Sequence, residues 1–279
     1  MTIKPILAGF FKLDGGAMFG VVPKTMWSKL VPPDENNLCT WALRCLLVEE
    51  GDTKLLIDAG MGDKQDAKFF SHYQPIGPSL AESLQAAGCA PESITDILLT
   101  HLHFDHCGGV LRREGEGFAP VFPRARVWVD KRHWEWAIKP NAREKASFLK
   151  ENLLPLQELG LLHFLPEGDN SPWPWLSMFR AYGHTDAMVL PVVNAGSRKV
   201  VFCADLFPSV HHLPMPYVMG YDMRPLETLA DKERFFSKAL EENWLLFFEH
   251  DAENECAFLE QTEKGIRAGK GMRLAEAGF

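Results

Sequence analysis

The chain has 279 residues, a net charge of −8 and a pI of about 5.7. This length fits one large domain or two modest ones, and a hydrophobic content of 46% is ordinary for a globular protein. The acidic balance argues against a nucleic-acid-binding surface, which is normally basic. No apolar run approaches the ~18 residues that span a bilayer, and the N-terminus lacks a basic region followed by an apolar core, so we expect a cytoplasmic protein without a signal peptide.

Hydrophobic periodicity predicts a strand-rich chain with interspersed helices. In chain order, we expect strands at 5–12, 16–22, 41–49 and 53–58, a helix at 79–88, strands at 94–99 and 126–130, a mostly helical 131–152, strands at 176–182, 188–194 and 198–204, a helix at 225–242 and a strand at 244–249. Strand-rich halves with helices at their ends favour two sheets packed face to face with helices outside. We treat residues 1–279 as a single domain.

Four side chains that bind metals stand within six positions, directly after the apolar stretch 97–99. They are His101, His103, Asp105 and His106. If the chain stays extended, the first three share one face, because strand side chains alternate; two glycines at 108 and 109 then permit a sharp turn. Imidazole and carboxylate ligands suit zinc, and also iron or manganese. One ion cannot use all four ligands, but two adjacent ions can. His101 and His103 would then bind one ion, and Asp105 and His106 would bind the other.

Other residues with metal-binding or reactive side chains follow or interrupt apolar strands further along the chain. Asp58 and Asp205 each end a predicted strand, where a carboxylate either serves a site or caps the turn. Six cysteines are scattered without Cys-X-X-Cys pairing, so we expect free, buried thiols. Cys107 and Cys203 lie near proposed ligands, and we favour packing over ligation for both.

The run His-X-His-X-Asp-His resembles the signature of the metallo-β-lactamase-fold hydrolases. The family's other motifs occur in the same order at Asp58, Gly183-His184-Thr185, Asp205 and His250. The resemblance covers most of the chain. It implies an α/β fold, the four-layer αββα sandwich, with two divalent ions between the sheets at one edge. Zinc is the first expectation, with iron or manganese as alternatives, and the resemblance also implies a homodimer.

The resemblance assigns each metal a set of ligands. It places His101, His103, His184 and Asp205 on one ion, and Asp105, His106, His250 and Asp205 on the other. Asp58 is expected to orient a ligand histidine. The implied chemistry is attack of a metal-bridging hydroxide on an ester, lactone or phosphotriester bond of a small molecule, with Asp105 accepting or relaying a proton.

Within the family, the chain is most similar to the acyl-homoserine-lactone lactonases and the methyl-parathion-type hydrolases. The run Val22-Pro23-Lys24 with Trp27, followed by 34–36, supports this placement. Two positions depart from the pattern. Met188 replaces the second histidine of Gly-His-Thr-X-X-His, and Phe207-Pro208 stands where the lactonases carry a tyrosine. We therefore do not commit to a lactone substrate.

The apolar, Pro-rich stretch 206–224 directly follows Asp205 and is expected to flank the mouth of the site. Predicted substrate contacts are Trp27, Phe104, Phe207, His211, His212, Met215 and Tyr217. The last four are each singly more often packing residues, whereas for Trp27 we favour a wall of the substrate pocket. Alternatives are a thioesterase or nuclease-type hydrolase of the same fold, or a non-catalytic metal-binding protein. The net charge opposes a nuclease, and a di-iron oxidoreductase typically has Glu where His103 stands.

Overall fold

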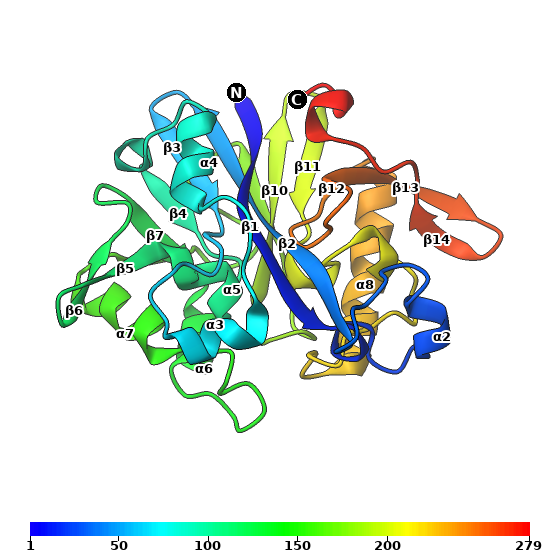
Figure 1. Cartoon of the computed structure of the whole chain (residues 1–279). Helices are drawn as coiled ribbons and strands as arrows, with labels where there is room; N and C mark the ends of the chain where they lie inside the picture. The colour runs from blue at the N-terminus through cyan, green and yellow to red at the C-terminus, as the bar shows by residue number, and fades with distance from the viewer. The chain divides into compact units, whose positions relative to one another are not determined.

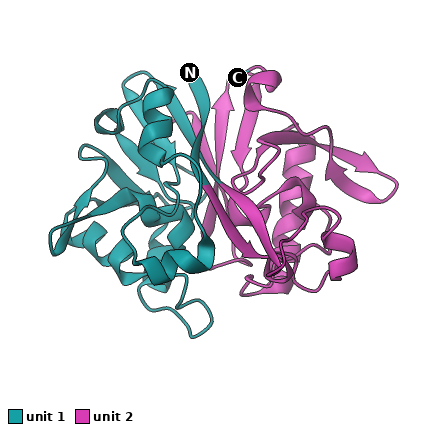
Figure 2. Cartoon of the chain, in the orientation of Figure 1, with its two compact units in different colours: residues 1–9, 43–172, 279 teal, residues 10–42, 173–278 magenta.

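The computed structural model describes residues 1–279 as fourteen strands, eight α-helices and five short 3-10 turns (Figure 1). Its contacts cluster into two compact units (Figure 2). Unit 1 comprises residues 1–9, 43–172 and 279, and unit 2 comprises residues 10–42 and 173–278. Each unit is thus assembled from separate stretches of sequence, and the first two strands contribute residues to both. The expectation of a single domain stays a prediction.

One six-stranded sheet, mainly in unit 1, has the order β1-β2-β3-β4-β7-β8. Its strands are β1 (Thr2–Asp14), β2 (Leu38–Glu50), β3 (Thr53–Ile57), β4 (Asp96–Leu98), β7 (Arg126–Val129) and β8 (Leu162–Phe164). Strands β2 and β3 form the predicted antiparallel hairpin, and β3, β4, β7 and β8 run parallel. Parallel neighbours end at the same edge of a sheet, so the residues just beyond β3 and β4 lie close together.

Helices and one small hairpin complete unit 1. They are α3 (Ala67–Tyr73), α4 (Leu80–Ala86), α5 (Phe104–Cys107), α6 (Lys131–Ala137), α7 (Lys150–Glu158), β5 (Leu111–Glu114) and β6 (Gly117–Pro120), with 3-10 turns at Pro91–Ser93 and Gly108–Val110. Helix α4, predicted from its apolar stripe, begins with a capping box between Ser79 and Glu82. The helical stretch expected over 131–152 is instead divided between α6 and α7.

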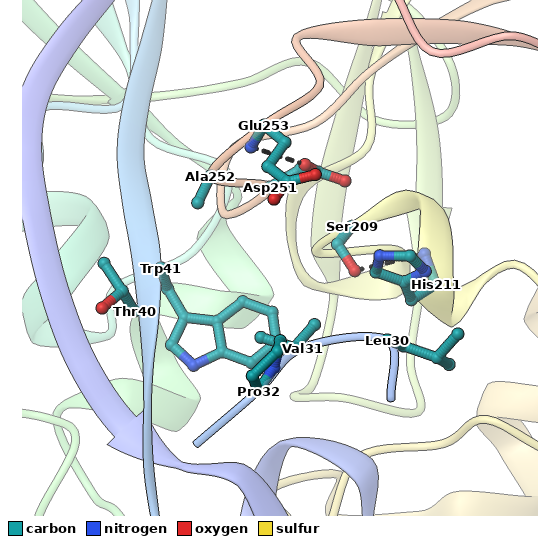
Figure 3. A pocket seen from close by; sticks show the side chains of 10 residues that line it. All are labelled: Leu30, Val31, Pro32, Thr40, Trp41, Ser209, His211, Asp251, Ala252 and Glu253. Atoms are coloured by element: carbon teal, nitrogen blue, oxygen red, sulfur yellow. Dashed lines mark hydrogen bonds between the residues drawn. The ribbon is translucent and has the colours of Figure 1, made fainter. Parts of the chain in front are cut away.

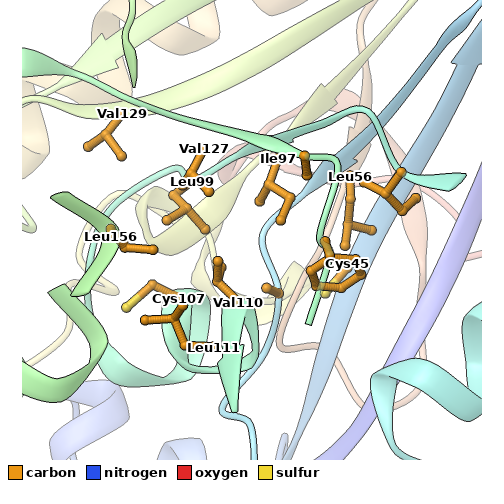
Figure 4. Packing of buried hydrophobic residues seen from close by; sticks show 14 of the residues in the cluster. Cys45, Leu56, Ile97, Leu99, Cys107, Val110, Leu111, Val127, Val129 and Leu156 are labelled. Atoms are coloured by element: carbon orange, nitrogen blue, oxygen red, sulfur yellow. The ribbon is translucent and has the colours of Figure 1, made fainter. Parts of the chain in front are cut away.

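The hydrophobic core of unit 1 is built from alternating residues of the central strands (Figure 4). Leu56, Ile97 and Val127 come from β3, β4 and β7, and all are almost completely buried. Cys107, the last residue of α5, packs into the same cluster. Burial of each such aliphatic side chain contributes about 1.5–3 kcal/mol. The core therefore anchors the short helix on which two of the predicted ligands lie.

The second six-stranded sheet lies in unit 2 and has the order β14-β13-β12-β11-β10-β9. Its strands are β9 (Leu176–Ala181), β10 (Met188–Ala195), β11 (Arg198–Phe202), β12 (Leu245–Phe247), β13 (Cys256–Thr262) and β14 (Gly265–Ala268). Strands β10 and β11 form the predicted hairpin, and β11 runs parallel to β12.

Unit 2 also contains α1 (Gly15–Phe19), α2 (Lys24–Trp27), the long α8 (Pro225–Glu241) and 3-10 turns at Ala204–Leu206, Val210–His212 and Leu274–Ala277. Helix α8 matches its predicted range closely and starts with Pro225 in its first turn. No helix anywhere in the structure combines the length and apolar character needed to cross a membrane.

The expected strand at 16–22 is wrong, because the chain turns into helix α1 there. The carboxylate of Asp14 accepts a hydrogen bond from the backbone N–H of Ala17 at 2.8 Å and so caps this helix. Trp27, a predicted substrate contact, is buried and stacks on Phe19 with ring centroids 5.6 Å apart. A Cβ added at Gly15 would lie 2.4 Å from the Trp27 ring. Only a glycine leaves room for this packing.

Candidate functional site

Unit 1 presents four predicted ligands where β4 passes into α5. Strand β4 ends at Leu98, and His101 and His103 lie on the irregular stretch that follows. His103 occupies the N-cap position of α5 (φ −64°, ψ 151°), so Asp105 and His106 lie on the helix. The interpretation of an extended chain through Asp105 is therefore wrong beyond His103. All four side chains are buried.

The nitrogen and oxygen atoms of these side chains face one another at distances suited to a metal. His101 Nε2 lies 3.1 Å from His103 Nδ1. His106 Nε2 lies 3.8 Å from an Asp105 carboxylate oxygen. Zinc–nitrogen bonds of about 2.0–2.1 Å place two tetrahedral ligands about 3.3 Å apart. Both pairs are thus compatible with a divalent ion, and buried imidazoles and carboxylates are its ordinary donor set.

Asp58, just past the end of β3, orients two of these histidines. Its carboxylate accepts hydrogen bonds from the backbone N–H and hydroxyl of Thr100, at 2.8 and 2.7 Å, and from His106 Nδ1 at 3.0 Å. Because the Thr100 hydroxyl donates to Asp58, it accepts from His101 Nδ1 at 3.0 Å. Both imidazoles consequently present Nε2. Asp58 adopts a left-handed backbone (φ 56°), a strained conformation of the kind that collects at functional sites.

Gly108 and Gly109 permit a close approach of two backbones. A Cβ at Gly108 would lie 1.9 Å from the carbonyl oxygen of Met61, and one at Gly109 would lie 2.0 Å from that of Ala59. Gly108 itself has ordinary helical angles, so close packing rather than a special turn requires glycine. The Ala59 N–H donates to the His106 carbonyl at 2.8 Å. This contact joins the chain after β3 directly to α5.

Glu144 and His133 also support this cluster, and sequence reasoning missed both. Glu144 Oε1 lies 3.5 Å from His103 Nε2, and its other oxygen accepts from Trp136 Nε1 at 2.7 Å. His133 Nε2 accepts from the backbone N–H of Leu102 at 2.9 Å. In the sequence, Glu144 stands in a charged run, 143–145, that reads as solvated surface. No pattern in it points to a buried carboxylate.

Unit 2 presents a second cluster, centred on Asp205. One Asp205 oxygen lies 3.1 Å from His184 Nε2, and the other lies 3.2 Å from His250 Nε2. Asp205 follows β11 and His250 follows β12, two parallel neighbours that end at the same sheet edge. Each carboxylate oxygen is thus paired with a different imidazole. A carboxylate that binds two metal ions directs one oxygen to each ion, and the two Asp205 oxygens are separated in this way.

The second ring nitrogens of these two histidines are also held. His184 Nδ1 donates to Asp222 at 2.9 Å, and His250 Nδ1 donates to the Ala42 carbonyl at 2.8 Å. Burial lowers the pKa of His184, but the charges and hydrogen bonds of Asp205 and Asp222 outweigh burial and raise that pKa to about 10. A carboxylate on each side makes His184 a strong electron-pair donor once its proton is displaced.

Helix α8 fixes the segment that carries His184. Thr228 donates from its hydroxyl to Asp222 at 2.8 Å, and Asp231 accepts the backbone N–H groups of Tyr182 and Gly183 at 2.6 and 2.9 Å. A Cβ at Gly183 would lie 2.2 Å from Thr228, which explains the glycine before His184. The sequence contains only a weak indication that α8 supports the site. Polar residues at 228, 231 and 232 interrupt the apolar face of an otherwise amphipathic helix.

Several residues expected to contact substrate are packed inside unit 2 or unit 1. Phe207 is fully buried against Phe235 and Phe236, and His212 is held between the Ser209 hydroxyl and the Met18 carbonyl. Trp27 and Phe104 are buried as well, whereas Met215 and Tyr217 are half-buried.

His211, in contrast, lines a cavity of about 180 Å³ (Figure 3). The lining residues are Leu30, Val31, Pro32, Thr40, Trp41, Ser209, His211, Asp251, Ala252 and Glu253. The cavity therefore has an apolar side and an acidic side. Burial lowers the pKa of His211, although Asp251 and Glu253 oppose this effect. The other six predicted contacts are not among the residues that line this cavity.

The cysteines near the ligands behave as packing residues. All six cysteines are buried and free of disulfides, as expected. The Cys107 thiol donates to the Leu102 carbonyl at 3.4 Å, and burial raises its pKa to about 12. Burial likewise raises the pKa of Cys203. Protonated thiols of this kind are poor metal ligands.

Known proteins resemble the chain in sequence and in structure. A family model for the metallo-β-lactamase superfamily matches residues 44–250. The N-acyl homoserine lactonase of Bacillus thuringiensis is 25% identical over 242 residues, which cover 82% of this chain and 87% of that protein. A probable metallo-hydrolase of Mycobacterium tuberculosis is 27% identical over 218 residues, which cover 69% and 66%.

Two solved structures extend the likeness over almost the whole chain. A probable metal-dependent hydrolase from Staphylococcus aureus superposes with a TM-score of 0.87 at 27% identity, covering 98% of both chains. The dizinc quorum-quenching lactonase AidC superposes with a TM-score of 0.78 at 22% identity, covering 98% of this chain and 95% of that one. The predicted α/β class and fold are confirmed. The chain belongs to the metallo-β-lactamase superfamily and is a metal-dependent hydrolase of that family.

Proposed function

We propose that this chain is a dinuclear hydrolase that cleaves an ester, lactone or phosphotriester bond of a small molecule. The observation that carries the proposal is Asp205, whose two oxygens each face one histidine at 3.1 and 3.2 Å. A strand-end carboxylate that only capped a turn would need neither histidine. Hydrolases with two metals commonly share one carboxylate between them.

The proposed ligands follow the motif order of the family. One ion would be held by His101, His103, His184 and Asp205, and the other by Asp105, His106, His250 and Asp205. Two divalent ions, for which zinc is our first choice, supply Lewis acidity and lower the pKa of bound water to about 7. Iron or manganese would meet the same donor set.

The chain's own residues then bind, orient and move protons. Asp105 is the carboxylate that we propose to accept or relay a proton, since it is buried beside His106. Asp58 and Asp222 hold His106 and His184 through Nδ1, so each imidazole presents the same nitrogen throughout the reaction. Fixed ligand orientation avoids reorganisation during turnover.

The substrate class rests on the relatives and on the character of the stretch after Asp205. Acyl-homoserine lactones are what the named lactonase relatives hydrolyse. In this chain Phe207, near the position of the lactonase tyrosine, has no hydroxyl and is fully buried. We therefore propose an apolar ester, lactone or phosphotriester rather than one named lactone.

The decisive experiment replaces the shared carboxylate. Asp205→Asn should lower the metal content of purified protein and abolish hydrolysis of a panel containing an ester, a lactone and a phosphotriester, because the amide cannot supply two anionic oxygens. Asp52→Asn, in the exposed turn after β2, is the matched control and should change neither. Full activity in Asp205→Asn would exclude the dinuclear assignment. Wild-type protein with a full metal complement but no turnover would exclude the substrate class alone.

A further inference from the structure

We propose that Tyr73, at the end of α3, lines the substrate site beside Asp105 and donates a hydrogen bond from its phenol to an oxygen of the bound substrate. The proposal rests on the hydrolase function proposed above and adds a residue from a segment outside the family motifs. Tyr73 would be a catalytic residue in the strict sense, because its hydroxyl would touch the substrate.

The ring of Tyr73 is fixed next to the predicted ligands. Its centroid lies 4.7 Å from that of Phe104, and Phe69 contacts both rings at 4.9 and 5.1 Å. Phe104 stands between His103 and Asp105 in the chain, and its backbone N–H donates to the Ser147 carbonyl at 3.0 Å. Helices α3 and α5 accordingly lie side by side (Figure 1). Three packed rings leave Tyr73 little freedom to move.

The hydroxyl of Tyr73 is the part of the side chain without a protein partner. The residue is half-buried, and its hydroxyl makes no hydrogen bond to another protein group. The hydroxyl is therefore available to a ligand molecule, and the ring contact with Phe104 places Tyr73 beside the segment that carries Asp105. Burial, and secondarily the charge of Asp105, raise the pKa of Tyr73 to about 12, so the phenol keeps its proton.

Two other hydroxyl groups in unit 1 are already engaged. The Thr100 hydroxyl donates to Asp58 at 2.7 Å, and Ser71, on the outer side of α3, donates to the Lys68 carbonyl at 2.7 Å. If Tyr73 only packed against Phe104, phenylalanine would serve equally well. This equivalence supplies the test, because Tyr73→Phe keeps the ring and removes the hydroxyl alone.

The experiment compares metal-loaded wild-type protein, Tyr73→Phe and Ser71→Ala, the last being an exposed hydroxyl removal on the same helix. For the best substrate of the ester, lactone and phosphotriester panel, Tyr73→Phe should lower kcat/KM by about ten- to hundred-fold, as expected for one lost hydrogen bond to a charged oxygen. The fall should be mainly in kcat, since charge on the oxygen develops in the transition state. Metal content and Tm should match the wild type, and Ser71→Ala should keep full activity.

Two results would overturn the proposal, and they differ from failure of the proposed function. Unchanged kcat and KM in Tyr73→Phe would show that the residue only packs. Loss of metal or a large fall in Tm in Tyr73→Phe would show a structural role. Absence of turnover of the whole panel by metal-loaded wild-type protein would instead overturn the proposed substrate class, and the Tyr73 proposal with it.

Discussion

Four of the five histidines proposed as ligands have a hydrogen-bond partner at the second ring nitrogen, and the partners come from different parts of the chain. The Thr100 hydroxyl accepts a hydrogen bond from Nδ1 of His101, and Asp58 accepts one from His106. Asp222 accepts one from His184, and the Ala42 carbonyl accepts one from His250. Such partners fix the tautomer and the ring direction before a metal arrives. At the scale of single residues, the metal-binding capacity therefore depends on groups that would not themselves touch the ions.

Asp222 offers the sharpest test of this dependence. Asp222→Ala should weaken metal binding by about 10- to 100-fold, because His184 loses its acceptor at Nδ1 and Thr228 loses its partner. Asp222→Asn keeps an acceptor oxygen and should recover part of the affinity. Competition with a coloured chelator measures both. In metal-free protein, NMR titration should also show the pKa of His184 falling from about 10 in either variant, since Asp222 helps to raise it.

A matched change elsewhere separates this effect from general destabilisation. Asp34→Ala removes a carboxylate that pairs with Lys12 at 2.6 Å and also lies in unit 2, and it should leave metal affinity unchanged. Equal affinities for wild type and Asp222→Ala would show that Asp222 has no part in orienting His184.

The predicted ligands were recognisable in the sequence because their type, order and spacing form a motif. Among their partners, Asp58 was expected from the same motif order, and it does hold His106, but the others were not expected. Asp222 lies 38 positions after His184, and Thr228 contacts it from a helix. Tyr73 meets Phe104, and Glu144 approaches His103, only through tertiary packing. A single sequence contains no local periodicity that reports such tertiary contacts. The residues that make them are therefore recognised only in the folded structure.

Helix α8 organises unit 2 at the scale of elements. Its buried polar side chains reach Asp222, the backbone before His184, and the loop after Asp205. Lys232 is fully buried, and its Nζ donates to the carbonyls of His212, Pro214 and Tyr217 at 2.7, 2.9 and 3.1 Å. Three acceptors match the three N–H groups of an ammonium. The loop expected to flank the site is thus tied to a rigid helix.

Lys232→Met should destabilise the protein and loosen this loop. The apolar chain keeps the volume but leaves three carbonyls without their donor, at a cost of about 1–3 kcal/mol for each that stays buried. Chemical denaturation should give a lower free energy of unfolding, and substrate KM should rise more than metal content falls. Lys238→Met, an exposed position on the same helix, is the control and should be near neutral. Equal stability of the two variants would contradict the role assigned to Lys232.

Element prediction succeeded where hydrophobic periodicity was strong and failed where a cap competed with it. The hairpins β2–β3 and β10–β11 and the helices α4 and α8 follow their predicted ranges. Residues 16–22 looked like a strand, yet Asp14 caps α1 and Gly15 admits Trp27 against the helix. Likewise the chain after His101 was expected to stay extended, and helix α5 begins at Phe104. In both places a local helix start outweighed a strand pattern.

At the scale of the whole molecule, the proposed ligands come from two compact units that are each built from separate stretches of chain. Ions bound by the ligands of a unit would stabilise that unit, because a ligand that binds only the folded state raises its stability by about 4 kcal/mol at a thousandfold excess over Kd. Removing metal with a chelator should therefore lower Tm and speed amide hydrogen exchange in residues 99–107 of unit 1 and in residues 203–207 and 248–251 of unit 2. Adding zinc back should reverse the change.

Asp205→Asn, which weakens ligation without deleting a histidine, should show a smaller difference in Tm and hydrogen exchange between the metal-loaded and metal-free states. Faster exchange confined to one unit would mean that the ions bind to one cluster only, and the ligands assigned in the other unit would then be wrong even if the protein remained an active hydrolase.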